Sequence, residues 1–349
     1  MCNPPIGRTN LTVSSGPAQT SSGALIGVAD VNNKAWVARV RFLPAVAFLV
    51  SSLIAGVATA QELAPRAYLP TPVGTRLLMT GYSLSTGDIV TDASLPITGV
   101  DSQIHNLLVG YQQTFDLLGR TTNARIEFPY VIGTTEGTAF GQPAERKVNG
   151  PGDIAMTFSI NLLGAPAMDR EAFVAMLRDP SPILGASLRI VAPTGEYDDE
   201  RLINIGTNRW STRLQLGYIH PFGNRWGLEL SAGAWLFGTN DDFMGMTRTQ
   251  DPIFAGELHL IRIMRSGTWV SLDGNYYAGG RSYLDDESNA DFQRNSRVGL
   301  SASWPFKQRH VIKASFSTGV ATKSGGNYEI YSLTYSYALK PQGGRGQTP

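Results

Sequence analysis

Apolar and polar side chains alternate along much of this chain. From Thr207 to His220 it reads TNRWSTRLQLGYIH, in which every second residue from Trp210 to Tyr218 shares one largely apolar face and the residues between are polar or glycine. Segment 225–237 repeats the alternation, and only the sequence PFGN separates the two. A period of two over this length predicts strands with two unlike faces, joined here by a tight turn.

The same period recurs through most of the sequence after residue 75. With the less regular segments included, about twelve strands are predicted, at 75–84, 103–117, 123–132, 153–162, 184–190, 207–220, 225–237, 253–264, 270–278, 297–304, 312–317 and 331–339. Many of these exceed the five or six residues usual in soluble sheets and suit tilted membrane strands. We therefore predict an all-β fold: a transmembrane antiparallel up-and-down β-barrel of about 12 strands. A soluble β-sandwich is the alternative.

The connections between the predicted strands support the membrane interpretation. Those expected on the periplasmic side are mostly short, at 118–121, 221–224, 265–267 and 305–309. Those on the opposite side are mostly long and polar, at 85–102, 133–151, 193–206, 239–252, 280–291 and 321–327. Outer-membrane barrels show this asymmetry.

One periplasmic connection breaks the rule. Residues 167–179 are predicted to form a short amphipathic helix that Asp169 caps and Pro180 follows. We expect this helix at the periplasmic rim, where Phe173, Met176 and Leu177 would face the membrane interface or the barrel mouth.

One sustained apolar run, Phe42–Val57, precedes all the strands. Basic residues lie before it and the small-residue sequence Ala58-Thr59-Ala60 follows, which is the pattern of a secretory signal peptide. A helical anchor, which needs about 20 apolar residues, is the alternative. The predicted divisions are a non-native or disordered extension (1–33), a signal peptide (34–60) cleaved after Ala60, the barrel (61–340) and a disordered tail (341–349).

The composition narrows the chemistry. The single cysteine, Cys2, lies upstream of the predicted cleavage site, which excludes disulfides, thiol catalysis and cysteine metal sites from the exported part. The formal net charge is +1, and charged residues make up 16% of the chain, below the usual value of about 25%. Neither charge nor aromatic spacing supports nucleic-acid binding. The sequence contains no cofactor motif, and we expect neither a cofactor nor a metal.

The polar faces of the strands are predicted to point into the barrel. They either form a charged constriction that selects solutes or a network of internal ion pairs that fills the lumen. Eight strands enclose only side chains or one small ligand, and sixteen enclose an aqueous channel, so twelve strands are compatible with both interpretations. The candidates for the constriction are Arg125, Glu127, Arg189, Arg209, Arg213, Glu229, Glu257, His259, Asp273 and Lys313.

Aromatic side chains and loop carboxylates supply further candidates. Four inward aromatic residues either form an apolar path for an aromatic solute or pack the upper lumen: Trp235, Phe237, Trp269 and Tyr277. Carboxylates cluster in three predicted loops, at 198–200, 241–242 and 285–287. Such oxygens suit Ca²⁺ or Mg²⁺, although solvated loop charge is the simpler interpretation.

One set of residues raises the question of catalysis. His259 and Glu257 share a face, and Ser271 and Asp273 lie on the next predicted strand, a combination able to activate a serine nucleophile. An outer-membrane lipid hydrolase would present its serine to the lipid, whereas His259 and Ser271 both have inward parity. We therefore predict that the protein is not an enzyme.

Five stretches together extend over nearly all of residues 61–340: PRAYLPTPVGTRLLMTGYSLSTGDIV, GPGDIAMTFSINLLGAPAM, SLRIVAPTGEYDDERLINIGTNRWSTRLQLGY, GLELSAGAWLFGTNDDF and WVSLDGNYYAGGRS. They resemble a bacterial family of outer-membrane transporters labelled "putative MetA-pathway of phenol degradation". The resemblance implies a barrel that passes small, often aromatic or apolar, molecules. The tail departs from the usual aromatic terminus of such barrels, because KPQGGRGQTP follows Leu339. An assembly signal is then expected within Tyr331–Leu339.

These observations predict a channel in the cell outer membrane for the passive passage of small, aromatic or apolar organic solutes. Its expected partners are membrane lipids and lipopolysaccharide, the outer-membrane assembly machinery and the organic solute itself. The alternatives are a non-conducting structural or surface-interaction barrel and, further removed, an outer-membrane lipid-modifying enzyme.

Overall fold

A computed structural model describes residues 64–89, 97–139, 141–223, 225–323 and 327–340. Within these residues, twelve strands form the wall of one antiparallel barrel. They are β1 (Arg76–Gly87), β2 (Ile97–Leu117), β3 (Arg120–Ala139), β5 (Ala155–Leu163), β6 (Ile183–Val191), β7 (Ser211–Phe222), β8 (Trp226–Phe237), β11 (Ile253–Ile263), β12 (Trp269–Gly279), β15 (Gln293–Lys307), β16 (His310–Ala321) and β17 (Tyr328–Ala338). The predicted fold is confirmed. The predicted extension (1–33), signal peptide (34–60) and tail (341–349) lie outside the described residues.

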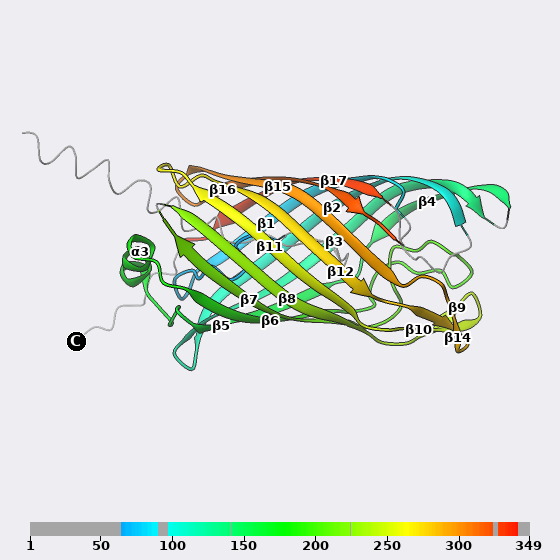
Figure 1. Cartoon of the computed structure of the whole chain (residues 1–349), viewed down its shortest axis with the longest axis horizontal. Coiled ribbons are helices and arrows are strands. Elements are labelled where there is room, and N and C mark those ends of the chain that lie inside the picture. The colour runs from blue at the N-terminus through cyan, green and yellow to red at the C-terminus, as the bar shows by residue number, and fades with distance from the viewer. Residues whose placement is uncertain (1–63, 90–96, 140, 224, 324–326, 341–349) are drawn as a thin grey trace, which may run out of the picture. The chain divides into compact units, whose positions relative to one another are not determined.

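Pairing between the last and first strands closes the sheet. β17 runs antiparallel to β1, with Ala338 opposite Leu77 and Tyr328 opposite Gly87. Every other wall strand pairs with the wall strands that precede and follow it along the chain (Figure 1). Closure gives the backbone groups of the wall partners within the sheet, which is the condition for a sheet to cross a bilayer.

Additional strands extend the structure at the end of the barrel opposite the helix (Figure 1). β4 (Gln142–Pro151) pairs with residues 130–139 of β3, whereas β5 pairs with residues 122–127 of the same strand. A second, small sheet consists of β9 (Asn240–Phe243), β10 (Met246–Gln250), β13 (Ser282–Leu284) and β14 (Glu287–Ser288). The predicted connections 133–151, 239–252 and 280–291 therefore contain strands of their own, which the sequence pattern did not predict. β4 lacks the alternation of the wall because it is exposed along nearly all of its length.

The two faces of the wall differ as the alternation predicts. On the outer face, Leu214 is 51% exposed and Leu300 is 60% exposed. On the inner face, His259 is 2% exposed and Asp273 is 1% exposed. An apolar outer surface that continues around a closed sheet has the character of a lipid-facing band, so the fold is that of a transmembrane barrel whose polar residues are inside.

A short helix, α3 (Arg170–Arg178), lies at one end of the barrel (Figure 1). Its predicted cap is confirmed, because the Asp169 carboxylate accepts a hydrogen bond from Ala172 N at 2.9 Å. Phe173 is fully buried in a cluster with Met168, Ile183, Ile219 and other apolar residues, so the helix packs on the barrel mouth. No helix of the described residues has the length and apolar character needed to cross a membrane.

We predict that a charge on the outer face is costly only at mid-membrane depth. Leu300 lies near the middle of β15, whereas Val320, which is 66% exposed, lies near the end of β16. Leu300→Arg should reduce the free energy of unfolding in lipid vesicles by about 2–4 kcal/mol, and Val320→Arg by about 0–1 kcal/mol. Denaturant titration measures both values. Equal losses would contradict the assignment of the lipid-facing band.

Candidate functional site

A belt of buried charged residues lines the lumen. Its first part lies on β3 and β6, where the Glu127 carboxylate forms ion pairs with two arginines. Arg125 Nη1 lies 3.4 Å from Glu127 Oε1, and Arg189 Nη1 donates to Glu127 Oε2. Arg125 Nε also donates to Gln112 Oε1 on β2 at 3.2 Å. One carboxylate thus serves two guanidinium groups in this part of the belt.

The second part of the belt lies on β7, β11 and β12. Arg213 donates to Glu257. His259 Nε2 lies 3.6 Å from Glu257 Oε2, and His259 Nδ1 lies 2.8 Å from Asp273 Oδ1. Asp273 Oδ2 accepts a further hydrogen bond from Ser301 on β15 at 2.6 Å. These residues form a chain of partners from Arg213 on β7 to Asp273 on β12, with β8 lying between β7 and β11 in the wall.

The register of β6 and β7 makes the two parts depend on each other. Arg189 and Arg213 are directly opposite across this strand pair, an arrangement that destabilises a sheet when the two charges are alike. Glu127 offsets one arginine and Glu257 the other. Loss of either carboxylate would leave a buried guanidinium without its partner, which is the expensive way to break an ion pair.

The geometry of the Ser271, His259 and Asp273 set differs from that of a hydrolase. Ser271 Oγ and His259 Nδ1 both bond to the same oxygen, Asp273 Oδ1. In a nucleophilic triad the histidine lies between the serine and the acid, whereas here the carboxylate lies between them. All three side chains face the lumen and are nearly fully buried. The arrangement fits a structural network.

A segment that the strand pattern did not reveal crosses the lumen. We call residues 64–75 the inner segment. Arg66 N donates to Glu229 Oε2 on β8 at 2.5 Å, and the Arg66 guanidinium lies 5.7 Å from the Trp269 ring on β12. Further along, Thr71 Oγ1 and Thr114 Oγ1 on β2 are 2.5 Å apart. Because β2 and β12 lie far apart around the wall, the segment spans the barrel.

Tyr68 is the central contact of the inner segment. Its ring packs on Gly185 and Gly217, where a Cβ atom at either position would overlap the ring. Its hydroxyl lies 2.9 Å from Ser187 Oγ and 3.2 Å from Gln215 Oε1. Glycine on the inner face of a strand often marks a close approach of another group, and this was the sequence signal that could have revealed the segment.

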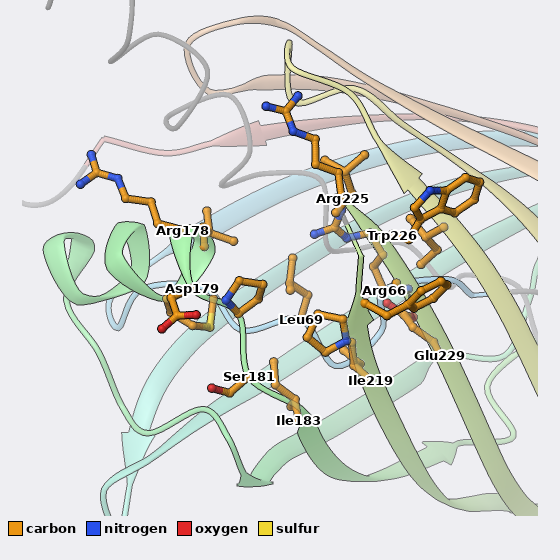
Figure 2. A pocket seen from close by; sticks show the side chains of 18 of the residues that line it. Arg66, Leu69, Arg178, Asp179, Ser181, Ile183, Ile219, Arg225, Trp226 and Glu229 are labelled. Carbon is orange, nitrogen blue, oxygen red and sulfur yellow. Dashed lines mark hydrogen bonds between the residues drawn. The ribbon is translucent and has the colours of Figure 1, made fainter.

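A cavity lies between the inner segment and α3, at the α3 end of the barrel (Figure 2). Its volume is about 780 Å³, whereas a cavity of about 10 Å³ remains between Tyr68 and the belt. The second volume holds no more than one water molecule. The inner segment therefore lies across the lumen at this level, packed closely against the wall residues beside Tyr68. Apolar residues make up the larger part of the lining of the large cavity, among them Leu69, Met176, Leu177, Ile183, Ile219, Ile261 and Ile263. Charged residues also line it: Arg66, Arg178, Asp179, Arg225, Glu229 and Arg265.

The remaining predicted constriction residues are Arg209, Lys313 and Glu229. Arg209 precedes β7, where it donates to Gln250 and its guanidinium lies 4.6 Å from the Phe237 ring. Lys313 is buried on β16. Glu229 on β8 is directly opposite the belt residue His259 on β11, and its carboxylate accepts a hydrogen bond from Arg66 N of the inner segment at 2.5 Å.

The four aromatic candidates lie at different depths in the barrel. Trp235 and Tyr277 share one apolar cluster, with Phe237 packed against it. Trp269 is at the other end of β12, eight residues from Tyr277, which corresponds to roughly 26 Å along a strand. Shared parity therefore fixes the inward face of these residues but not their depth, and whether they form a path for a solute stays a prediction.

The acidic loops do not form a metal site in the described part of the chain. No group of three or more histidine, cysteine or carboxylate side chains there could hold a metal ion. Asp198 accepts from Glu200 N, and Asp285 accepts from Thr247 N at 2.8 Å. At least these two carboxylates stabilise turns of the loops.

Comparison with known families identifies the relationship. The family model described as "Putative MetA-pathway of phenol degradation" matches residues 86–337. The chain belongs to this family. The MetA-pathway match spans the wall from the end of β1 to β17, so the belt and the glycines of the Tyr68 contact lie within it, whereas the inner segment precedes it.

The fold also occurs in a solved outer-membrane channel. The COG4313 outer membrane channel from Pseudomonas putida F1 aligns with a TM-score of 0.65 and 22% identity, covering 81% of this chain and all of that one. The transport unit of the autotransporter AIDA-I from Escherichia coli aligns at a TM-score of 0.47 and 9% identity, over 84% of this chain and 96% of that one. No curated protein sequence matches the chain.

We predict that the belt carboxylates are required for stability. Glu257→Gln removes the buried charge opposite Arg213 and should lower the free energy of unfolding by about 3–5 kcal/mol. Glu145→Gln is the matched control, because its pair with Lys147 is solvent-exposed at 2.8 Å and exposed pairs contribute little. Denaturant titration in vesicles compares the two variants. Similar stability of both would show that Glu257 is dispensable to the belt.

Proposed function

We propose that the protein is an outer-membrane channel through which small aromatic or apolar organic solutes pass down their concentration gradient. The observation that carries this proposal is the cavity of about 780 Å³ that ends against the inner segment. Its volume falls within the roughly 300–1,000 Å³ of small-molecule sites. Its mainly apolar walls suit an apolar solute, and Arg66 and Glu229 lie at its inner side (Figure 2).

The belt supports passage of uncharged solutes. Charges of both signs are already paired with each other across the strands, so a neutral molecule displaces none of these partners. An ion would compete with them at a buried position, where unpaired charge is costly. The belt therefore selects against ions while keeping the wall folded.

The inner segment gives the channel a closure that can open. Export with cleavage after Ala60 makes Gln61 the first residue of the exported protein, and the inner segment is then tethered to the wall only through β1. It is held in place by hydrogen bonds of Arg66, Tyr68 and Thr71 and by the packing of Tyr68 in the cluster around Phe173, and within the described residues it has no strand pairing of its own. With the amino terminus on the periplasmic side of the membrane, α3 and the cavity face the periplasm. The barrel contacts membrane lipids and lipopolysaccharide after insertion by the assembly machinery.

Closure of the lumen also supports a second candidate, a non-conducting structural or surface-interaction barrel. A small cavity of about 10 Å³ lies between Tyr68 and the belt. A barrel that never opens would protect the same interior without passing any solute. The two candidates differ in whether the inner segment moves.

We predict that amino-terminal sequencing of the exported protein begins at Gln61. Cleavage after Ala60 follows the small-residue pattern that precedes the polar pair Gln61-Glu62. A protein that retains residues 34–60 would instead carry a helical anchor, and its inner segment would be tethered at both ends. Edman degradation or intact mass of the membrane-extracted protein decides between these outcomes.

We predict that Tyr68→Ala opens the channel. Removal of the ring from between Gly185 and Gly217 leaves a gap in the closed level of the lumen, so planar-bilayer recordings should show a conductance at least several-fold higher than that of the unaltered protein. Vesicle uptake of benzyl alcohol should increase as well. The control is Tyr331→Ala, since Tyr331 is on the outer face and 45% exposed. Absence of both current and uptake in Tyr68→Ala would favour the non-conducting barrel.

A further inference from the structure

The wall beneath Tyr68 is shaped for a phenol. Gly185 and Gly217 are directly opposite in the register of β6 and β7, and Ser187 and Gln215 are the next inward pair. The glycine pair supplies a flat surface for the ring. The Ser187 and Gln215 pair supplies the partners of the hydroxyl. We call these four residues the phenol seat.

The phenol seat is oriented by its surroundings. The Gln215 side-chain amide donates through Nε2 to Ser231 Oγ at 2.7 Å, which turns Oε1 toward the Tyr68 hydroxyl. The backbone oxygen of Gln215 lies 3.4 Å from the same hydroxyl. The seat thus presents acceptor oxygens to one O–H donor and an uninterrupted surface to one ring.

We propose that the phenol seat is a binding site for free phenolic solutes, and that Tyr68 is a tethered ligand that occupies it until a solute takes its place. This inference rests on the proposed channel function and names the chemical class of the solute. The side chain of tyrosine is p-cresol in all but its attachment, so the bound pose of Tyr68 shows how such a solute would lie.

The polar partners exclude related molecules. Toluene would cover the glycine pair but leave the Ser187 and Gln215 oxygens without the donor that Tyr68 now supplies, and an unpaired buried polar group lowers affinity strongly. Benzoate would bring its negative charge against the two oxygens of Gln215. A neutral phenol satisfies both the shape and the hydrogen bonds.

Displacement of Tyr68 requires only a moderate solute concentration. A ligand on a short flexible tether competes at an effective concentration in the millimolar range, so solute at similar concentration shifts the equilibrium. Arg66 beside it has a φ of 68°, in the left-handed region that costs a non-glycine residue about 1–2 kcal/mol. Release of the inner segment relieves this strain and thereby favours exchange.

The experiment follows the inner segment while free phenol is added. Ala67 is half-buried against the cluster around Phe173, so Ala67→Cys in a Cys2→Ser background reports exposure through its rate of labelling by a maleimide in nanodiscs. p-Cresol should accelerate labelling at least fivefold, with saturation at millimolar concentration. Toluene at equal membrane load should not. Adding Ser187→Ala should raise the p-cresol concentration needed at least fivefold.

Variants of the two partners separate this site from a nonspecific cavity. Tyr68→Ala removes the tethered competitor, and should bind p-cresol at least tenfold more tightly than the unaltered protein by ¹⁹F line broadening of the probe 4-fluorophenol in competition. Gly217→Ala fills the seat and, combined with Ala67→Cys, should label rapidly with or without p-cresol. Tyr328→Ala is the control, because Tyr328 is another buried lumen tyrosine on a different strand, and its labelling in the same Ala67→Cys background should follow the unaltered barrel.

The inference is overturned if p-cresol leaves the labelling rate of the Ala67→Cys variant unchanged and Tyr68→Ala binds 4-fluorophenol no better than Tyr328→Ala. The outcome is separable from that of the channel proposal. Phenol-dependent labelling without solute uptake would keep the phenol seat and reject the channel. Uptake that is independent of p-cresol and of the seat variants would keep the channel and reject the seat.

Discussion

The need to pair every backbone group inside a bilayer determines the rest of this structure. A sheet meets that need only by closing, as β1 and β17 do here. Closure sends every second side chain inward, away from lipid, where polar and charged groups must find partners among themselves. The belt meets this requirement, because Glu127, Glu257 and Asp273 pair with the inward arginines and histidine. A solute that crosses such a barrel therefore passes charged side chains that are already paired with one another.

A twelve-stranded lumen is too wide for its inward side chains to fill everywhere, and the inner segment completes the packing. Several of its residues are as buried as the inward side chains of the wall, among them Arg66 at 2% and Thr71 at 1% exposure. Larger side chains on the wall would have closed the lumen permanently. Glycines at 185 and 217 instead leave space for a ring that belongs to a separate piece of chain. Closure by a separate segment is reversible in a way that closure by the wall is not.

Sequence periodicity predicted the barrel and the inward orientation of residues such as Glu257 and His259, because a period of two decides which face a side chain occupies. Depth along the strand depends on register and tilt, which the pattern does not contain. Trp269 and Tyr277 therefore shared a predicted path although they lie at opposite ends of β12. The inner segment was missed because a chain that crosses a lumen has no repeating environment. The only sign of it in the strand sequences is the pair Gly185 and Gly217, on which the Tyr68 ring packs. From sequence alone, these glycines indicate only positions of low strand propensity.

The glycine pair is also the strongest reason to regard the closed lumen as functional. Glycine within a strand costs roughly 0.5–1 kcal/mol relative to alanine, and two of them opposite each other concentrate that cost at one point of the wall. A purely structural plug would be served as well by alanine in the wall and a smaller residue in place of Tyr68. The combination of a large ring, a flat seat and oriented acceptors at Ser187 and Gln215 is more specific than packing requires. Specific polar groups around an aromatic ring are what recognition of a small molecule needs.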